Sequence, residues 1–348
     1  MAATLKLDTL QNASSAVPNI TLDTAGNATV GNTLAMGSSF LRNRIINGGM
    51  SCYQRGSVSA TTSGAYTLDR WFVMPTGATV TVTQSTSTVP TGFANSLNVA
   101  GAASVTNVSV YQRIESVNTQ DLASGVQVTV SGWIRQSTGS AVTTATVALT
   151  TPSAADNYTS TSSAATTYTI PSIANATWVQ FSNTFTLTSS CVNGLQVTIA
   201  LGTGLTTGSF NLTGVQLEVG SVATPFERRQ YGTELMLCQR YLPVFSNVGN
   251  AGTAAVYVGQ AYTTTQAAIP LTNLVPTRVP ATGIVFSGTA TLYTANAGAT
   301  TNVTIGFNSA SLNATQVVAT GNAVLVAGNA THLNFAGGAY IYGTGCEL

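Results

Sequence analysis

The sequence offers little of the chemistry that catalysis requires. It has one histidine and ten acidic side chains in 348 residues. A nucleophile activated by an imidazole base would have to use His332. The residues around it, Asn329-Ala-Thr-His-Leu-Asn-Phe335, have a plain strand pattern, which predicts a solvent-facing histidine on a β-strand. We therefore expect no nucleophilic catalysis.

The acidic residues are poorly placed for the hydrolysis of sugars, which needs two carboxylates about 5 to 9 Å apart. The last third of the chain has only Glu234 and Glu347. Ion pairing or turn capping accounts for most acids in the middle of the chain, which include Asp69, Glu115, Asp121, Glu218 and Glu227. We predict a protein that is not an enzyme and has no catalytic residues.

No metal or cofactor site is indicated. Asp156 has no obvious structural task, and with Asn157 it could offer oxygen ligands to calcium. One acid and one amide are too weak a pattern to predict such a site. The cysteines are Cys52, Cys191, Cys238 and Cys346. Their spacing is not that of metal ligands and does not require a disulfide, so we expect free, mostly buried thiols.

Sugar binding needs flat aromatic faces and polar side chains rather than charge. The tryptophans are Trp71, Trp133 and Trp178. Each lies in a predicted strand among apolar residues, so we expect all three in the core. Tyr158 and Tyr168 lie in or beside Thr151–Ala176, which reads as a long polar loop with a short strand near Tyr168. These two tyrosines are the candidate ligand-binding residues.

Nucleic acids and nucleotides are not expected partners. The net charge is +1, and Lys6 is the only lysine. Scattered arginines do not form the basic field that a phosphate backbone needs. The best glycine-rich candidate for a phosphate loop, Leu201–Gly208, has no Lys-Ser/Thr after it. Its glycines, Gly202, Gly204 and Gly208, are predicted to be part of a hairpin turn.

Neither export nor membrane insertion is indicated. The first residues, MAATLKLDTLQ, lack the apolar run of about seven residues that follows the basic end of a signal peptide. No stretch approaches the ~18 apolar residues of a membrane span. We expect a protein made in a reducing cytoplasm, which agrees with free thiols.

Composition and periodicity favour an all-β fold. Charged residues make up 6% of the chain, against about 25% in an ordinary globular protein. Alternation is clear from Val126 to Arg135, where Val128 and Val130 share one face of a strand. Trp133 breaks this pattern after Gly132, which indicates a β-bulge.

Strand patterns recur at the spacing of a β-sandwich on both sides of residues 230–243. We predict a jelly-roll β-sandwich over residues 42–229 and a second, smaller antiparallel β-sandwich over residues 244–348. The second includes a strand at Ala323–Val326. The alternation and turn in Asn19–Gly31 predict a β-hairpin. Because one hairpin is not stable alone in water, residues 1–41 are interpreted as an anchoring or assembly segment.

One helix is predicted to join the two sandwiches, within residues 230–243. Four residues recur at helical spacing and are expected to form one apolar stripe: Tyr231, Leu235, Cys238 and Tyr241. Glu227 near its start and Arg240 near its end suit the helix dipole, and Pro243 is expected to end the helix.

Several motifs, in this order, resemble a domain of tailed-phage virion proteins. They are Asn43-Arg-Ile-Ile-Asn-Gly-Gly-Met50, Gln54-Arg-Gly56, Tyr66-Thr-Leu-Asp-Arg-Trp71, Val130–Arg135, Trp178–Phe185, Gly214–Gly220, Ala223–Arg229 and Glu234–Tyr241. The resemblance covers residues 42–242 well and the last sandwich loosely. The final Glu347-Leu348 is also similar to the ends of such chains.

The resemblance implies a jelly roll like those of carbohydrate-binding modules, in a tail-fibre or spike subunit. It implies a homo-oligomer, commonly a trimer, assembled in the host cytoplasm and located in the virion. The expected partners are other virion proteins, through the N-terminal segment, and a glycan or protein of the host surface. The alternative is a head fibre, capsid decoration or tail adaptor without receptor binding.

Overall fold

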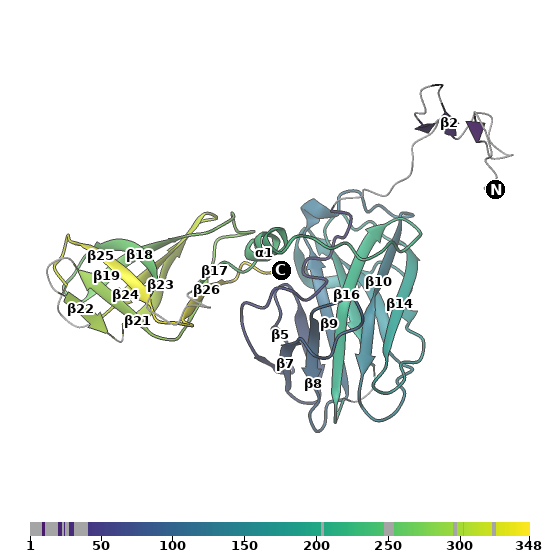
Figure 1. Ribbon diagram of the computed structural model, residues 1–348, viewed down its shortest axis with the longest axis horizontal. Helices are drawn as coiled ribbons and strands as arrows, with labels where there is room; N and C mark the ends of the chain where they lie inside the picture. The colour runs from purple at the N-terminus through teal and green to yellow at the C-terminus, as the bar shows by residue number, and fades with distance from the viewer. Residues whose placement is uncertain are drawn as a thin grey trace, which may run out of the picture. The chain divides into compact units, whose positions relative to one another are not determined.

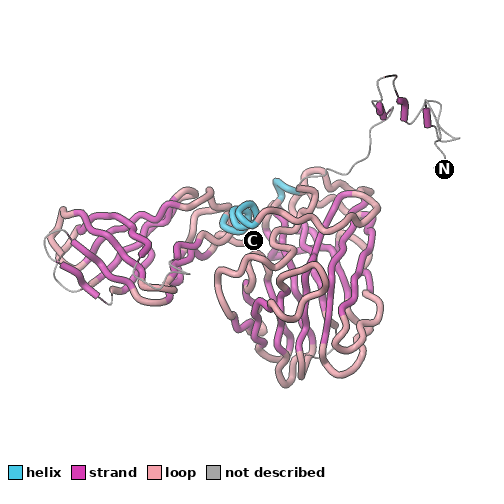
Figure 2. The backbone as a smooth tube through the Cα atoms, in the orientation of Figure 1, coloured by secondary structure: helices cyan, strands magenta, loops and turns pink. Residues whose placement is uncertain are grey.

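A computed structural model describes residues 9–10, 20–22, 24, 28–30, 41–202, 205–246, 254–294, 298–301, 303–321 and 325–348. The chain divides into two compact units, residues 1–42 and 43–348. Strands dominate the described residues, whose one α-helix is α1, Tyr231–Gln239 (Figures 1 and 2). No helix in these ranges has the length and apolarity to cross a membrane.

The first unit contains a three-stranded antiparallel sheet. Its strands are β1 (Thr9–Leu10), β2 (Ile20–Leu22) and β3 (Ala28–Val30). The pairing of β2 with β3 confirms the predicted hairpin, and β1 adds a third strand on the other side of β2. The expected turn residues Gly26 and Asn27 lie outside the described residues.

Two antiparallel sheets form the predicted jelly-roll β-sandwich (Figure 1). The six-stranded sheet has the order β14 (Trp178–Thr186), β10 (Gln127–Gln136), β16 (Ser209–Val219), β8 (Ser96–Ala100), β7 (Val80–Ser85) and β4 (Val58–Ala60). The other has the order β12 (Asn157–Ser163), β11 (Thr146–Ala154), β15 (Leu195–Ala200), β9 (Asn107–Ile114), β6 (Phe72–Thr76) and β5 (Ala65–Tyr66). The short strand β13 (Tyr168–Thr169) pairs with β11, and a 3-10 turn, Ser116–Asn118, follows β9.

The jelly-roll core comes from the inward-facing residues of both sheets. Val128 and Val130 of β10 are buried there, as their alternation predicts. They share this core with residues of the other sheet such as Val110 and Val197. Trp71 is fully buried in the same cluster, which confirms its predicted place.

The predicted loop Thr151–Ala176 is largely β-structure, and that prediction is corrected. Strand β11 continues to Ala154, and β12 pairs back against it. Most side chains of β12 are exposed, because this strand forms the edge of its sheet beyond the core. A strand without a buried face has no apolar alternation, so the sequence gives no signal for it.

The prediction of a hairpin turn at Leu201–Gly208 is wrong. The strands before and after it, β15 and β16, belong to different sheets, so the segment crosses from one sheet to the other. Gly202 and Gly208 have φ angles of +85° and +75°. A Cβ at either position would lie about 2 Å from a carbonyl oxygen, that of Thr144 or Ser137. Gly204 lies outside the described residues.

The second sandwich is also antiparallel, as predicted. Its small sheet has the order β17 (Val244–Ser246), β26 (Tyr340–Thr344) and β20 (Gly283–Ser287). Its seven-stranded sheet has the order β22 (Gly298–Thr301), β21 (Ala290–Thr294), β25 (Ala330–Phe335), β18 (Ala254–Ala261), β19 (Gln266–Thr272), β24 (Ala314–Thr320) and β23 (Thr304–Ala310). One core contains Phe245 and Ile341 from the small sheet and Leu292 and Leu333 from the large one. Of the strand expected at Ala323–Val326, the two described residues are not in a strand.

Helix α1 differs from its prediction in its buried face. Tyr231 is 59% exposed, whereas Glu234, Cys238 and Gln239 are buried. The helix ends at Gln239, several residues before Pro243. The apolar stripe expected from spacing is therefore correct for Cys238 and Tyr241, which are buried, and wrong for Tyr231. Polar side chains of the helix share its buried face.

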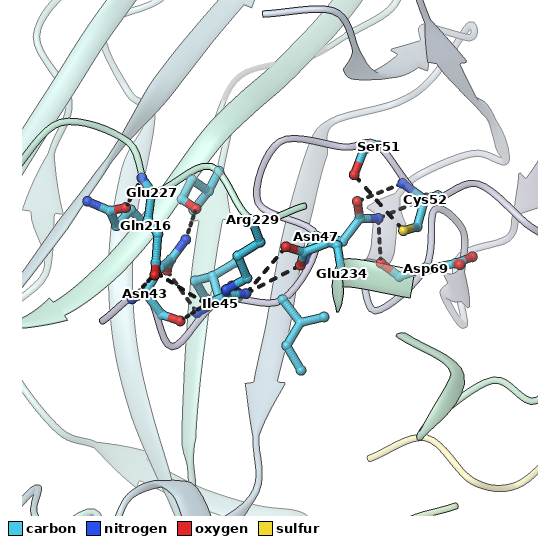
Figure 3. A network of polar contacts seen from close by, with 12 residues as sticks. Asn43, Ile45, Asn47, Ser51, Cys52, Asp69, Gln216, Glu227, Arg229 and Glu234 are labelled. Atoms are coloured by element: carbon cyan, nitrogen blue, oxygen red, sulfur yellow. Dashed lines mark hydrogen bonds and ion pairs between the residues drawn. The ribbon is translucent and has the colours of Figure 1, made fainter. Parts of the chain in front are cut away.

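Asn47 is the centre of this polar joint (Figure 3). Its φ is +57°, and its side chain donates hydrogen bonds to the carbonyls of Cys52 (2.8 Å) and Asp69 (3.0 Å) and accepts one from the Cys52 amide (2.9 Å). Its own amide donates to the carboxylate of Glu234 on α1. Its carbonyl accepts from the Trp71 indole at 2.9 Å. The Asn47 turn thus links the core tryptophan to the helix.

Arg229 adds a second connection beside the first. It pairs with Glu234 at 3.3 Å and with Glu227 at 3.5 Å, and Figure 3 shows its side chain among these groups. The same guanidinium donates to the carbonyls of Ile45 and Asn43. Glu227 in turn accepts from the Asn43 amide at 2.8 Å. The opening and closing motifs of the jelly roll are therefore parts of one buried network.

We predict that Asn47→Ala destabilises the protein by about 3 kcal/mol or more, because three hydrogen bonds to buried main-chain groups are lost. Urea denaturation followed by near-ultraviolet circular dichroism measures the difference. Asn313→Ala is the control, since Asn313 is an exposed turn residue. Equal stability of the two variants would contradict the role given to Asn47.

The last residues of the chain return to the jelly roll. Glu347 forms an ion pair with Arg55 at 2.5 Å, with about one tenth of each side chain exposed. The carbonyl of Leu348 accepts from Arg113 at 2.8 Å and from the Tyr66 hydroxyl. The second sandwich is thereby connected to the jelly roll at both of its chain ends, through α1 and through residues 346–348.

This contact predicts a pH dependence. Burial raises the pKa of Glu347 from its ordinary 4.5 to about 7, against the lowering effect of Arg55. The folded state therefore binds the Glu347 proton more tightly than the unfolded state. The contribution of this proton to the free energy of unfolding is complete below pH 4.5 and is lost as the pH rises to about 7. Relative to Glu347→Gln, the unfolding free energy of the wild type should fall by up to about 3 kcal/mol across this window. Parallel curves for the two proteins in urea titrations between pH 4 and 8 would refute this expectation.

Candidate functional site

Strand β10 carries two large side chains on the sheet face that lies away from the core. Val128, Val130 and Ile134 are buried in the core. Because successive residues of a strand point to opposite faces, Trp133 and Arg135 point to the other face. Both are partly exposed.

Cross-strand register extends this outward face over the neighbouring strands. Trp133 lies opposite Gln180 of β14, and Arg135 lies opposite Trp178. Directly opposed residues of antiparallel strands share a face. The outer face is defined here by Trp133, Arg135, Trp178, Gln180, Asn211 and Thr213. It brings two partly exposed indoles together with polar side chains.

A β-bulge shapes this face. A bulge lies beside Trp133, as predicted, but the additional residue is in β16, and Trp133 itself does not break the alternation of β10. The register shifts between Ser131 and Trp133, which lie opposite Gln216 and Thr213 of β16. Gly214 and Val215 of β16 thus oppose the single residue Gly132 of β10, and Gly214 has φ +62°.

The bulge lies under a cavity of about 230 Å³. Its lining includes Phe93, Trp133, Gln180, Phe226 and Arg228. The Phe93 and Phe226 rings are 5.3 Å apart, and the Arg228 guanidinium lies 4.8 Å from the centre of the Phe93 ring. The walls come from the segments before β8 and after β16, while the floor is the outer face. Such a mixture of aromatic rings and a few polar groups is typical of small-ligand sites.

Polar side chains of the outer face are held by hydrogen bonds. The amide of Asn211 donates to Asn98 of β8 at 3.1 Å. Arg135 donates to the Ala176 carbonyl at 3.2 Å. Thr213 donates to the Asn95 carbonyl at 2.7 Å. Asn211 and Thr213 are fully buried, so these bonds satisfy their polar groups within the chain, and Arg135 and Gln180 are the polar side chains of the outer face that remain accessible.

The prediction that Trp133 and Trp178 lie in the core is wrong. Both are partly exposed on the outer face. The sequence did contain a signal for Trp133, because this residue lies an even number of positions from the polar Thr129 and Ser131 and therefore shares their face of the strand. Phe93, Phe226 and Arg228 lie in connecting segments without periodicity, so only the structure brings them together.

The tyrosines chosen from the sequence line two other cavities. The Tyr158 hydroxyl donates to the Ile114 carbonyl at 2.8 Å, and Arg113 lies 4.8 Å from the ring centre. Burial, with a smaller effect of Asp156, raises the pKa of Tyr158. Tyr168 is packed against the jelly-roll core and lines an open cavity of about 450 Å³. Ligand binding by either tyrosine stays a prediction.

Asp156 has a structural task that the sequence did not reveal. Its carboxylate accepts hydrogen bonds from the amide and the hydroxyl of Ser116, at 2.7 and 3.3 Å, at the start of a 3-10 turn.

His332 lies on β25 with its ring stacked on that of Tyr293, and the ring centres are 5.2 Å apart. Asp156 and His332 therefore each have a structural contact that accounts for their position.

All four cysteines are free and buried, as predicted. The structure also brings Cys52, Cys238 and Asp69 together, with their potential ligand atoms within 4.8 Å of one another. Both oxygens of Asp69 accept hydrogen bonds from Gln54, at 3.1 and 2.6 Å. Burial raises the pKa of Asp69 and that of the Cys238 thiol, which opposes the deprotonation that metal binding requires. A hydrogen-bonding role at the joint explains this cluster better than a metal.

No protein-family model matches the chain, and no curated protein matches it. Solved structures align with about half of its length. The enzymatically active domain of bacteriophage CBA120 tailspike protein 4 aligns with 15% identity and a TM-score of 0.36, over 51% of this chain and 22% of that one. TmCBM61, solved with beta-1,4-galactotriose, aligns with 14% identity and a TM-score of 0.33, over 51% and 99%. The CBM22-1 xylan-binding domain of Paenibacillus barcinonensis Xyn10C aligns with 13% identity and a TM-score of 0.30, over 52% and 96%.

We predict that Gly214→Ala destabilises the jelly roll and narrows its cavity. A Cβ there would lie 2.6 Å from the Phe93 ring and 3.1 Å from the Trp133 ring. With the cost of a left-handed φ, the loss of stability should be at least about 2 kcal/mol. Gly56→Ala is the matched control, because Gly56 has φ +72° and open space around it. Equal losses in chemical denaturation of the two variants would show that the bulge accommodates the methyl group.

Proposed function

We propose that the chain is a non-catalytic subunit of a phage tail fibre or spike, and that its outer face binds host-surface glycans. The observation that carries this proposal is the pair Trp133 and Trp178, placed by register on one exposed sheet face. A sugar ring presents a flat apolar side, which packs on an indole, and a rim of hydroxyls. The exposed side-chain amide of Gln180, directly opposite Trp133, offers a donor and an acceptor to those hydroxyls.

The absence of an unused pair of acids supports a binding rather than a catalytic role. Every acidic residue in the ranges 41–202, 205–246 and 325–348 contacts a partner on the chain. These acids are Asp69, Glu115, Asp121, Asp156, Glu218, Glu227, Glu234 and Glu347. A glycosidase would need two carboxylates facing a sugar.

The assignment to a phage appendage rests on the motif resemblance between residues 42 and 242. We propose a homo-oligomer, with a trimer favoured, assembled in the host cytoplasm and incorporated into the virion through residues 1–41. Several copies would convert a modest affinity for each glycan into strong attachment. Tyr158, Tyr168 and the second sandwich are further places where the host surface could be contacted.

We predict that Trp133→Ala and Trp178→Ala each weaken glycan binding about tenfold or more, from the loss of aromatic contact area. The purified full chain is tested on a microarray of bacterial polysaccharides, and the strongest ligand is titrated by calorimetry. Blocking of phage adsorption by the free protein gives a second readout.

Tyr262→Ala is the matched control, since Tyr262 is an exposed aromatic residue of the second sandwich. Loss of binding in Tyr158→Ala or Tyr168→Ala, with both tryptophan variants unaffected, would move the site to the other cavities. A folded, oligomeric protein that binds no glycan and blocks no adsorption would favour a head fibre, capsid decoration or tail adaptor.

A further inference from the structure

We propose that the outer face is selective for acidic glycans, those that carry carboxylate or phosphate groups. This inference rests on the proposed glycan binding and adds the chemical class of the ligand. It depends on two arginines, Arg135 and Arg228, and on the absence of a carboxylate facing them within the described residues.

The charges near this face are of one sign. Arg228 is exposed at the rim of the cavity, and Arg135 is partly exposed two residues after Trp133. Neither forms an ion pair with another described residue, whereas the partly exposed Arg44 is paired with Asp121 at 2.6 Å. In a chain with 6% charged residues, two unneutralised cations on one face form a distinct positive region.

The nearest carboxylate on β16 is already engaged. Glu218 is only 3% exposed, and both of its oxygens accept hydrogen bonds within the chain. Its partners are Gln216 and Thr224, including the Thr224 amide at 3.1 Å. This acid therefore closes the turn after β16 and presents little charge to the outer face.

The Arg228 guanidinium is held in position by contacts that leave some of its hydrogen-bond donors free. It lies over the rings of Phe93 and Phe226, with 4.8 and 5.7 Å to the ring centres. One nitrogen donates to the Gly92 carbonyl at 2.5 Å. A guanidinium has five donors, so others remain for an anion in the cavity. Such a fixed planar group suits the two oxygens of a carboxylate or a phosphate.

Arg135 is fixed in the same way on the sheet itself. It donates to the Ala176 carbonyl and lies 3.5 Å from the Asn211 side-chain oxygen. Register places Trp178 directly opposite it. An acidic sugar packed against this indole would bring its anionic group within reach of the guanidinium.

The other arginine-rich cavity lacks this selectivity. It is lined by Arg113 and Arg278 but also by Asp156 and Glu347, and residues of the C-terminal segment occupy several of its donors. Charges of both signs there do not distinguish acidic from neutral sugars. The outer face is therefore the better candidate for an anionic ligand.

The test compares each glycan with its own uncharged form. The full chain is applied to a microarray containing polygalacturonate, alginate, glycerol-phosphate teichoic acid, dextran and galactan, together with bacterial envelope polysaccharides. Bound acidic glycans are then titrated before and after reduction of the carboxyl groups or removal of the phosphates. These two treatments distinguish a carboxylate ligand from a phosphate ligand. We expect binding to fall about tenfold or more on removal of the anionic group, and to weaken with added salt.

Arg135→Gln and Arg228→Gln should each weaken binding of the acidic form about tenfold or more, and should weaken binding of the neutral form much less. Arg228→Lys should recover only part of the affinity, since lysine keeps the charge and loses the planar donors. Arg44→Gln is the control, because it removes one positive charge away from the outer face.

Equal binding of acidic and neutral forms, or wild-type binding by both glutamine variants, overturns this inference and leaves the proposed glycan binding intact. No binding to any glycan on the array overturns both.

Discussion

The structure depends on the buried hydrogen bond from the main-chain amide of Asn47 to the Glu234 carboxylate. It joins the first turn of the jelly roll to the only described helix, across 187 positions of sequence. Both groups are buried, so each needs the other to replace lost water. Arg229 pairs with the carboxylate and donates a hydrogen bond to the carbonyl of Ile45, just before Asn47. The result is a jelly roll whose two chain ends are fixed together before the chain leaves for the second sandwich.

This joint separates the part of the jelly roll that maintains the fold from the part available for binding. The joint is built from residues near Asn43–Asn47 and Glu227–Glu234. The outer face uses other residues, such as Trp178 and Gln180 of β14, a strand whose inward side is ordinary core. Substitutions of accessible residues on that face, such as Trp178 and Gln180, are expected to have little effect on folding, because neither the core nor the joint involves their side chains.

The fold class and most strands of the sandwiches followed from alternation, and the hairpin from its turn. The outer face was not predicted from the sequence, because a tryptophan in a valine-rich strand is usually a core residue. Trp133 is an odd number of positions from Val128 and Val130, which places it on the opposite face of the strand. The cavity wall was beyond sequence reasoning, since Phe93 and Phe226 meet only through folding. The buried face of α1 was misjudged for a related reason. Spacing predicts which residues share a face of the helix. It does not predict that Glu234 is buried, because the main-chain amide that donates to its carboxylate belongs to Asn47, far away in the sequence.

The return of residues 346–348 to the jelly roll makes the second sandwich an insertion with two anchored ends rather than a terminal appendage. A domain held in this way transmits a pulling force through two parallel attachments, so neither has to bear the whole load. It also restricts recombination between related genes. An exchange of the second sandwich that omits the few codons for its final contacts would leave Arg55 buried without its counter-ion, and only exchanges that keep both ends together would preserve the jelly roll.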